Sequence, residues 1–124
     1  AHRRLKTESS ERIIPLVGCS LWAAKRIKDN ATDGFCFSRY CSEANCNSNS
    51  ASAAINKWIK TVIGTDAVLH GLRHGFRDRL RAVEAPTDMI DQLGGWSMSG
   101  VGQNYGDGYP LGLMHRWMEK ITTN

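Results

Sequence analysis

The chain has 124 residues, of which 41% are hydrophobic, and this suits one compact domain or part of one. It contains no run of about 18 apolar residues, so we expect no membrane-spanning helix and no membrane partner. The net charge of +4 is compatible with a polyanionic partner, but so modest a charge selects no class of protein by itself.

The start of the chain predicts a small β-hairpin. Residues 3–6 and 11–16 flank the polar turn TESS, and the second segment contains the β-branched run RIIPL. Pro15 closes that strand, because proline cannot donate to a ladder of backbone hydrogen bonds. Lys6 stands directly before the turn, near the tip of the predicted hairpin.

A short helix is expected next, over residues 20–29, with Ser20 as its candidate N-cap. The small, polar residues 30–52 then predict a loop or a mobile insertion. Three of the four cysteines fall in this loop at intervals of five residues, namely Cys36, Cys41 and Cys46. Zinc sites usually use tighter cysteine pairs, and nothing indicates secretion, so we expect reduced thiols with neither a metal nor a disulfide framework.

The second half of the chain predicts helices that are separated by glycine and proline. An amphipathic helix over residues 52–64 ends at Gly64, and the helical pattern resumes over residues 70–85. The expected core residues are Ala54, Ile55, Trp58, Ile59 and Val62 in the first of these helices, and Leu72, Phe76, Leu80 and Val83 in the second.

Two shorter helices complete the pattern. One covers residues 86–94, begins at a proline and ends at two glycines, and Thr87 or Asp88 can help to satisfy the free amides of its first turn. The other covers residues 111–121, and its apolar stripe suits packing on its own domain and packing on a neighbouring protomer equally well. That stripe comprises Leu111, Met114, Trp117, Met118 and Ile121. The sequence therefore predicts a mainly α-helical domain with one small hairpin.

Several residues have side chains that are suited to phosphate chemistry. His70 and Arg73 form an H-x-x-R unit on one side of a helix start, and the planar fork of arginine matches two phosphate oxygens. Trp96 offers an indole N–H, and a lysine such as Lys6 can protonate a leaving oxygen. A tyrosine becomes a useful nucleophile when cations surround the phosphate that it attacks. Taken singly, each of these residue types more commonly has a structural or solvated role.

The order and spacing of these features are more specific than any one of them. The hairpin lysine, HGLR, GGW and a tyrosine follow one another, with Tyr105 nine residues after Trp96 and Trp96 twenty-three after Arg73. This arrangement resembles the tyrosine recombinases, the phage-integrase family, in the Cre-like variant that has tryptophan where most relatives have histidine. The resemblance covers nearly the whole chain and is weakest over residues 29–50.

The resemblance implies a tyrosine recombinase catalytic-domain fold and DNA cleavage and rejoining without a metal or other cofactor. Tyr105 would attack a backbone phosphate and become joined to the 3′ end. Arg73, His70 and Trp96 would hold that phosphate. Lys6 would be the general acid toward the leaving 5′ oxygen. Tyr109 lies four residues beyond Tyr105, where the family's spacing has no functional tyrosine, and it is expected to pack or to lie on the surface.

The resemblance also implies double-stranded DNA and other recombinase protomers as partners, in a tetrameric synapse of the full-length parent, and a cytoplasmic protein of bacterial or phage origin. Residues 1–124 would be one partial catalytic domain, truncated at its N-terminal side. The family's other catalytic arginine precedes the lysine hairpin, and Arg3 and Arg4 are wrongly placed to replace it. We therefore expect the isolated chain to cut DNA poorly or not at all.

Three other functions stay open at this point: a DNA-binding relative that does not cut, a type IB topoisomerase, and a helical interaction module without DNA chemistry. The complete set of candidate residues argues against a decayed relative. The GGW spacing and the short hairpin favour a recombinase over a topoisomerase.

Overall fold

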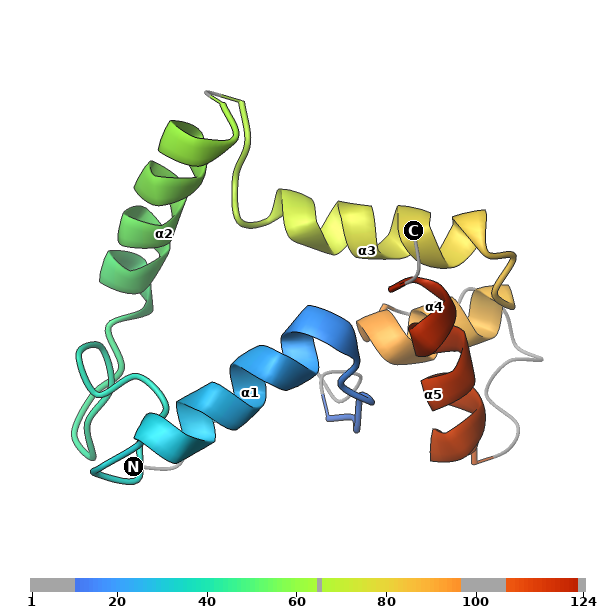
Figure 1. The fold of residues 1–124 in the computed structure, drawn as a ribbon, viewed down its shortest axis with the longest axis horizontal. Coiled ribbons are helices and arrows are strands. Elements are labelled where there is room, and N and C mark those ends of the chain that lie inside the picture. The colour runs from blue at the N-terminus through green and yellow to red at the C-terminus, as the bar shows by residue number, and fades with distance from the viewer. Residues whose placement is uncertain (1–10, 65, 97–106, 123–124) are drawn as a thin grey trace.

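The computed structural model describes residues 11–64, 66–96 and 107–122, and the regular secondary structure of these residues is α-helical (Figure 1). The helices are α1 (Gly18–Asn30), α2 (Ser48–Val62), α3 (Gly71–Ala82), α4 (Thr87–Gly94) and α5 (Leu111–Lys120). The predicted helical class is therefore confirmed, and each predicted helix has a counterpart in the structure.

The predicted β-hairpin is absent from the described residues. Its first strand and its turn lie outside them, and residues 11–17, which include the second strand, have no regular secondary structure. This segment instead packs on the helices. Pro15 and Val17 are buried, and Arg12 Nε donates a 3.0 Å hydrogen bond to the Leu93 carbonyl at the end of α4. The segment is thus held by side chains rather than by a strand partner among the described residues.

α1 begins two residues before the predicted start, and Ser20 is not its N-cap. Val17 occupies the cap position with extended backbone, and Ser20 lies in the first turn. The Ser20 hydroxyl accepts a 3.2 Å hydrogen bond from the Val17 N–H and donates one of 2.7 Å to the Val17 carbonyl. The serine therefore stabilises the helix start from inside the first turn.

The loop between α1 and α2 contains one disulfide. A turn in which Ser42 N–H donates to the Asn45 carbonyl brings Cys41 and Cys46 together across an antiparallel bridge, and their sulfurs are bonded. The expectation of reduced thiols is therefore wrong for this pair, because a tight turn closes their spacing of five residues. Cys19 and Cys36 are free and exposed.

α2 is amphipathic as predicted, but most of its apolar side is exposed. It begins four residues early because the Asn47 side chain caps it, accepting a 3.1 Å hydrogen bond from Ser50 N–H. Ile59 is the buried residue of this helix, whereas Trp58 and Val62 are each 62% exposed. Figure 1 shows the reason, since α2 stands apart from α4 and α5.

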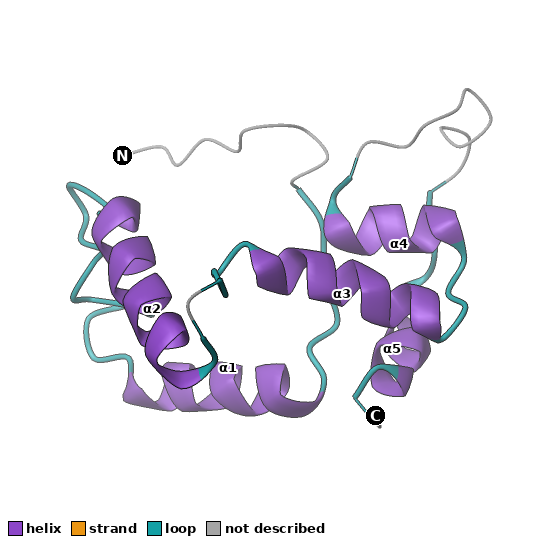
Figure 2. Ribbon diagram, turned by 90° about the horizontal axis from the view of Figure 1, so that it is seen from above, coloured by secondary structure: helices purple, strands orange, loops and turns teal. Residues whose placement is uncertain are grey.

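The core lies between the C-terminal half of α3, α4 and α5. α3 and α4 run side by side (Figure 2), and α5 packs against them. The buried cluster comprises Val17, Leu80, Ala85, Met89, Ile90, Leu93, Met114, Met118 and Ile121. The apolar stripe of α5 thus packs on its own chain through Met114, Met118 and Ile121, while Leu111 stays half-exposed.

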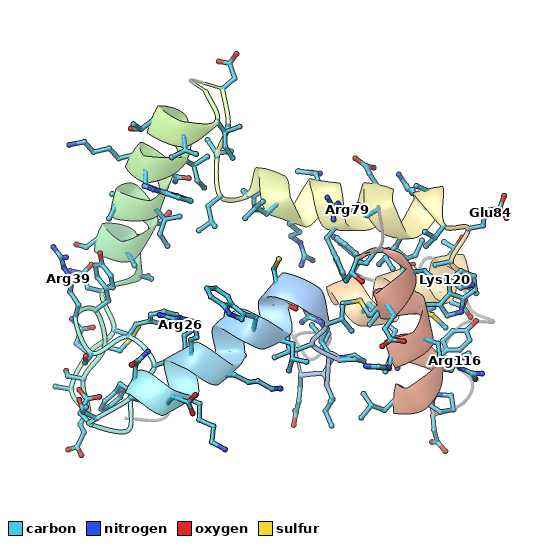
Figure 3. All side chains as sticks on the ribbon, viewed as in Figure 1. Arg26, Arg39, Arg79, Glu84, Arg116 and Lys120 are labelled. Carbon is cyan, nitrogen blue, oxygen red and sulfur yellow. A yellow bond between two sulfur atoms is a disulfide. The ribbon has the colours of Figure 1, made fainter. Side chains whose placement is uncertain are left out.

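The core face predicted for α3 is correct only toward its C-terminal end. Leu80 is fully buried, and Phe76 and Val83 pack against the core. Leu72 is 62% exposed, because it lies in the first turn of α3, beyond the point where α4 covers the helix. Arg79 lies above the end of α5 (Figure 3), where its Nη1 donates a 3.3 Å hydrogen bond to the Ile121 carbonyl.

Candidate functional site

The start of α3 places His70 and Arg73 on the same turn. His70 holds the N-cap position without a side-chain capping bond, and its carbonyl accepts a 3.1 Å hydrogen bond from Arg73 N–H. The His70 ring is exposed and meets the His74 ring edge-on, with centroids 5.3 Å apart. The imidazole is therefore accessible, and it is not engaged in capping the helix.

Arg73 in α3 comes together with Trp96, which follows the C-terminal cap of α4. The guanidinium carbon of Arg73 lies 4.4 Å from the centre of the Trp96 ring, which is within the range of a cation–π contact. No carboxylate in the described part of the chain lies within ion-pair distance of Arg73. Its N–H donors are thus oriented by an aromatic ring and not neutralised by a described acid, which suits a group that receives an anion.

The glycines before Trp96 each have a specific geometric use. Gly95 has φ 62°, a left-handed conformation that favours glycine, and the Trp96 N–H donates a 3.0 Å hydrogen bond back to the Asp91 carbonyl. A Cβ atom on Gly94 would overlap the Trp96 ring. The chain therefore turns back at Gly95 and lays the indole directly on the end of α4.

A second arginine contacts the same ring, and the sequence did not single it out. The guanidinium carbon of Arg77 lies 4.6 Å from the Trp96 ring centre, and Arg77 Nη2 lies 3.4 Å from Asp91 Oδ1. Asp91 is the buried charged residue of the core region, at 4% exposure. The signal available in the sequence was an arginine four residues after Arg73, on the same helix face.

Tyr109 has a structural role that separates it from Tyr105. Its hydroxyl donates a 2.7 Å hydrogen bond to Asp88 Oδ1, and its backbone N–H donates to Gln92 Oε1 at 2.8 Å. The hydrogen bond to the Asp88 carboxylate, with burial and the negative charge adding to it, raises the pKa of Tyr109 above its ordinary value of 10.0. A raised pKa disfavours the phenolate, so Tyr109 is suited to packing and not to nucleophilic attack.

Tyr105 and Lys6 lie outside the described residues, as do Arg3 and Arg4. The structure therefore brings together Arg73 and Trp96, and His70 holds the N-cap position of α3 three residues before Arg73. It leaves the nucleophile and the general acid as predictions from the sequence.

The described residues also bear on other types of site. No group of three or more His, Cys, Asp or Glu side chains there could hold a metal ion. Among the described helices, none combines the length and apolar character that crossing a membrane requires. A pocket of about 340 Å³ between α1 and the following loop is lined by Trp22, Arg26 and Phe35, and it includes none of the predicted site residues.

Comparison with known proteins gives one partial match. A stretch of 55 residues, 44% of this chain, is 38% identical to the prophage integrase IntF of Escherichia coli (strain K12). The stretch covers 12% of that protein's length. No protein-family model matches the chain, and no solved structure matches it. The similarity supports a relationship with integrases at most.

Proposed function

We propose that this chain belongs to a site-specific DNA recombinase, which cuts and rejoins DNA strands through a 3′-phosphotyrosine intermediate. The observation that carries the proposal is the contact between Arg73 and Trp96 beside an exposed His70. These groups supply a guanidinium fork, an indole N–H and an imidazole, and each of the three can donate a hydrogen bond to a DNA phosphate. The partial similarity to a prophage integrase supports the same direction.

In the proposed reaction Tyr105 loses its hydroxyl proton to solvent and attacks the scissile phosphorus as the phenolate. The new bond joins the tyrosine oxygen to the 3′-phosphate, and the bond to the 5′ oxygen breaks. Lys6 gives a proton to that leaving oxygen, while Arg73 and Trp96 stabilise the charge of the pentacoordinate transition state. Attack by a 5′-hydroxyl on the phosphotyrosine restores the DNA backbone, so the sum of the two steps consumes no cofactor.

In this proposal His70 and Arg73 bind different oxygens of the same phosphate. Arg73 provides two parallel donors, and its orientation comes from the aromatic ring below it. His70, three residues earlier, binds one further phosphate oxygen or accepts and donates a proton during the reaction. Double-stranded DNA and further recombinase protomers are the partners that strand exchange requires.

The proposal is tested with the 124-residue chain and a nicked suicide substrate, in which the departing 5′ fragment diffuses away. Cleavage is expected to be slow because the chain holds one candidate phosphate-clamping arginine among its site residues. Two modified substrates therefore accompany the natural phosphate. A 5′-bridging phosphorothiolate removes the need for a general acid, and a methylphosphonate removes the charge that a second cation would neutralise.

The expected result is a covalent protein–DNA adduct on at least one modified substrate, mapped to Tyr105 by mass spectrometry. Tyr105→Phe should abolish the adduct, whereas Tyr109→Phe, the matched control, should retain it. DNA binding without an adduct on any of the substrates would favour a relative that does not cut. Absence of both binding and adduct would overturn the proposed function.

A further inference from the structure

We propose that Arg77 and Asp91 form a positioning pair that fixes the Trp96 ring against Arg73. Arg77 and Arg73 lie one turn apart on α3, and both guanidinium groups lie within 5 Å of the same ring centre, at 4.6 Å and 4.4 Å. Arg77 is thereby a positioning residue, while Arg73 keeps the proposed contact with phosphate. The consequence for DNA rests on the proposed function, but the geometry of the pair does not.

The charges explain why the two arginines have different tasks. Two guanidinium groups one turn apart repel each other, and a nearby acid reduces that repulsion for the one it contacts. Asp91 lies 3.4 Å from Arg77 Nη2, and no described carboxylate lies within ion-pair distance of Arg73. The Arg77 charge is thus compensated by Asp91, whereas no carboxylate of the described residues compensates the Arg73 charge.

Burial makes the pair a restraint rather than a surface contact. The Asp91 side chain is 6% exposed and the Arg77 side chain 36%, so water screens the pair less than it screens an exposed one. Arg77 Nε is buried without a hydrogen-bond partner among the described residues. Among the described residues, Asp91 and the Trp96 ring are therefore the contacts that orient the Arg77 guanidinium.

The Asp91 backbone joins the same unit. Its carbonyl accepts the hydrogen bond from Trp96 N–H, while its side chain holds Arg77. One residue of α4 therefore fixes Trp96 twice, once through the main chain and once through the arginine that lies against the ring. This double attachment explains why an acid is placed inside the end of α4, where burial of a carboxylate is costly unless it is paired.

The geometric part of the inference is tested without DNA. The chain has four tryptophans, so its indole N–H region in a two-dimensional ¹H–¹⁵N spectrum can be assigned by the loss of one peak in Trp96→Phe. Arg77→Gln and Asp91→Asn should each shift the Trp96 indole resonance, and Arg77→Lys should shift it less. Arg81→Gln, on the same helix with a 61% exposed side chain, is the matched control and should leave it unchanged.

The functional part is tested by DNA affinity, measured as fluorescence anisotropy of a short duplex at several salt concentrations, with variants confirmed to be folded. Arg77→Gln should weaken binding about five- to tenfold in the wild-type background, and it should have no further effect in an Arg73→Gln background. Additive losses, with the salt slope falling by a further ~0.9, would show that Arg77 contacts phosphate itself and would overturn the positioning role.

The experiments distinguish a failure of the Arg77–Asp91 pair from a failure of the proposed DNA function. An unshifted Trp96 resonance in Arg77→Gln would overturn the positioning pair, whether or not the chain binds DNA. If the wild-type chain binds no DNA but the resonance shifts as expected, the proposed function fails and the positioning pair stands. A lower melting temperature in Arg77→Gln with unchanged resonance and unchanged affinity would assign Arg77 a role in stability alone.

Discussion

The Tyr109 hydroxyl donates a 2.7 Å hydrogen bond to Asp88 Oδ1, and this bond joins the segment before α5 to the first turn of α4. Gln92 strengthens the same junction, because its side-chain amide both accepts from Tyr109 N–H and donates to the Tyr109 carbonyl. The Asp88 carboxylate also accepts from Met89 N–H at 3.0 Å, so it satisfies one free amide of the first turn as expected, while Pro86 holds the N-cap position without a side-chain capping bond. One aromatic side chain thus fixes the approach to the last helix.

Tyr109→Phe is expected to lower the free energy of unfolding by about 1 kcal/mol at neutral pH, because a partly buried hydrogen bond to a carboxylate is lost. The folded-state pKa of Tyr109 is raised above 10.0, so this stabilisation is present below pH 10 and disappears as the pH rises through the folded-state pKa. Urea unfolding of both proteins at pH 8 and pH 11 measures the difference. A gap that persists undiminished at pH 11 would contradict the assignment.

Gly94→Ala should displace the Trp96 ring, because a methyl group at this position overlaps it. Gly95→Ala should cost about 1 kcal/mol through its left-handed backbone, φ 62°, while leaving the ring in place. Gly112→Ala in α5 meets no atom within 4 Å and serves as the control, with unchanged or slightly raised stability. The indole resonance of Trp96 and urea unfolding distinguish the three variants.

Leu80→Ala and Leu72→Ala test where the core of α3 begins. Leu80 is 0% exposed, so its truncation should cost about 2–5 kcal/mol by leaving a cavity. Leu72 is 62% exposed, so the same substitution should change stability by about 0.5 kcal/mol or less. Chemical denaturation of both variants gives the comparison. Equal losses at the two positions would show that α3 is covered along its whole length.

Arg79→Gln should destabilise the end of α5 by about 1 kcal/mol, because the Ile121 carbonyl loses its 3.3 Å hydrogen bond from Nη1. Arg81→Gln is the control, since its contact with Asp78 spans 4.0 Å on the exposed side of the same helix. The thermal midpoints of the two variants should therefore differ. A loss of equal size in both would point to helix propensity and not to the contact with α5.

Periodicity was sufficient to predict the helices but not the places where they are covered. The pattern of α3 assigns Leu72 and Leu80 to one face, yet only Leu80 meets α4 and α5. A sequence records which side of a helix is apolar, and the extent of the neighbouring helix decides how much of that side is buried. The exposure of Trp58 on α2 has the same cause.

The hairpin prediction failed on the described residues because it used local propensity alone. The β-branched run before α1 fits a strand, but its side chains find long-range partners instead, as when Arg12 bonds to the Leu93 carbonyl. The GGW turn was predictable because glycine reports backbone conformation directly. The role of Arg77 was not predictable, because the sequence of a basic helix such as α3 does not distinguish an arginine that pairs with a buried acid from one that is solvated.

Because buried residues are distributed unevenly, the free energy of local unfolding should differ from helix to helix. α1 buries no residue and α2 buries Ile59, whereas most of α4 is enclosed by the core. Amide protons of α2 should therefore exchange with solvent deuterium through local opening, while those of α4 should exchange only through global unfolding. The Asp91 carbonyl that holds Trp96 belongs to the slowly exchanging α4, so this anchor would keep its place while the α2 end of the molecule opens and closes.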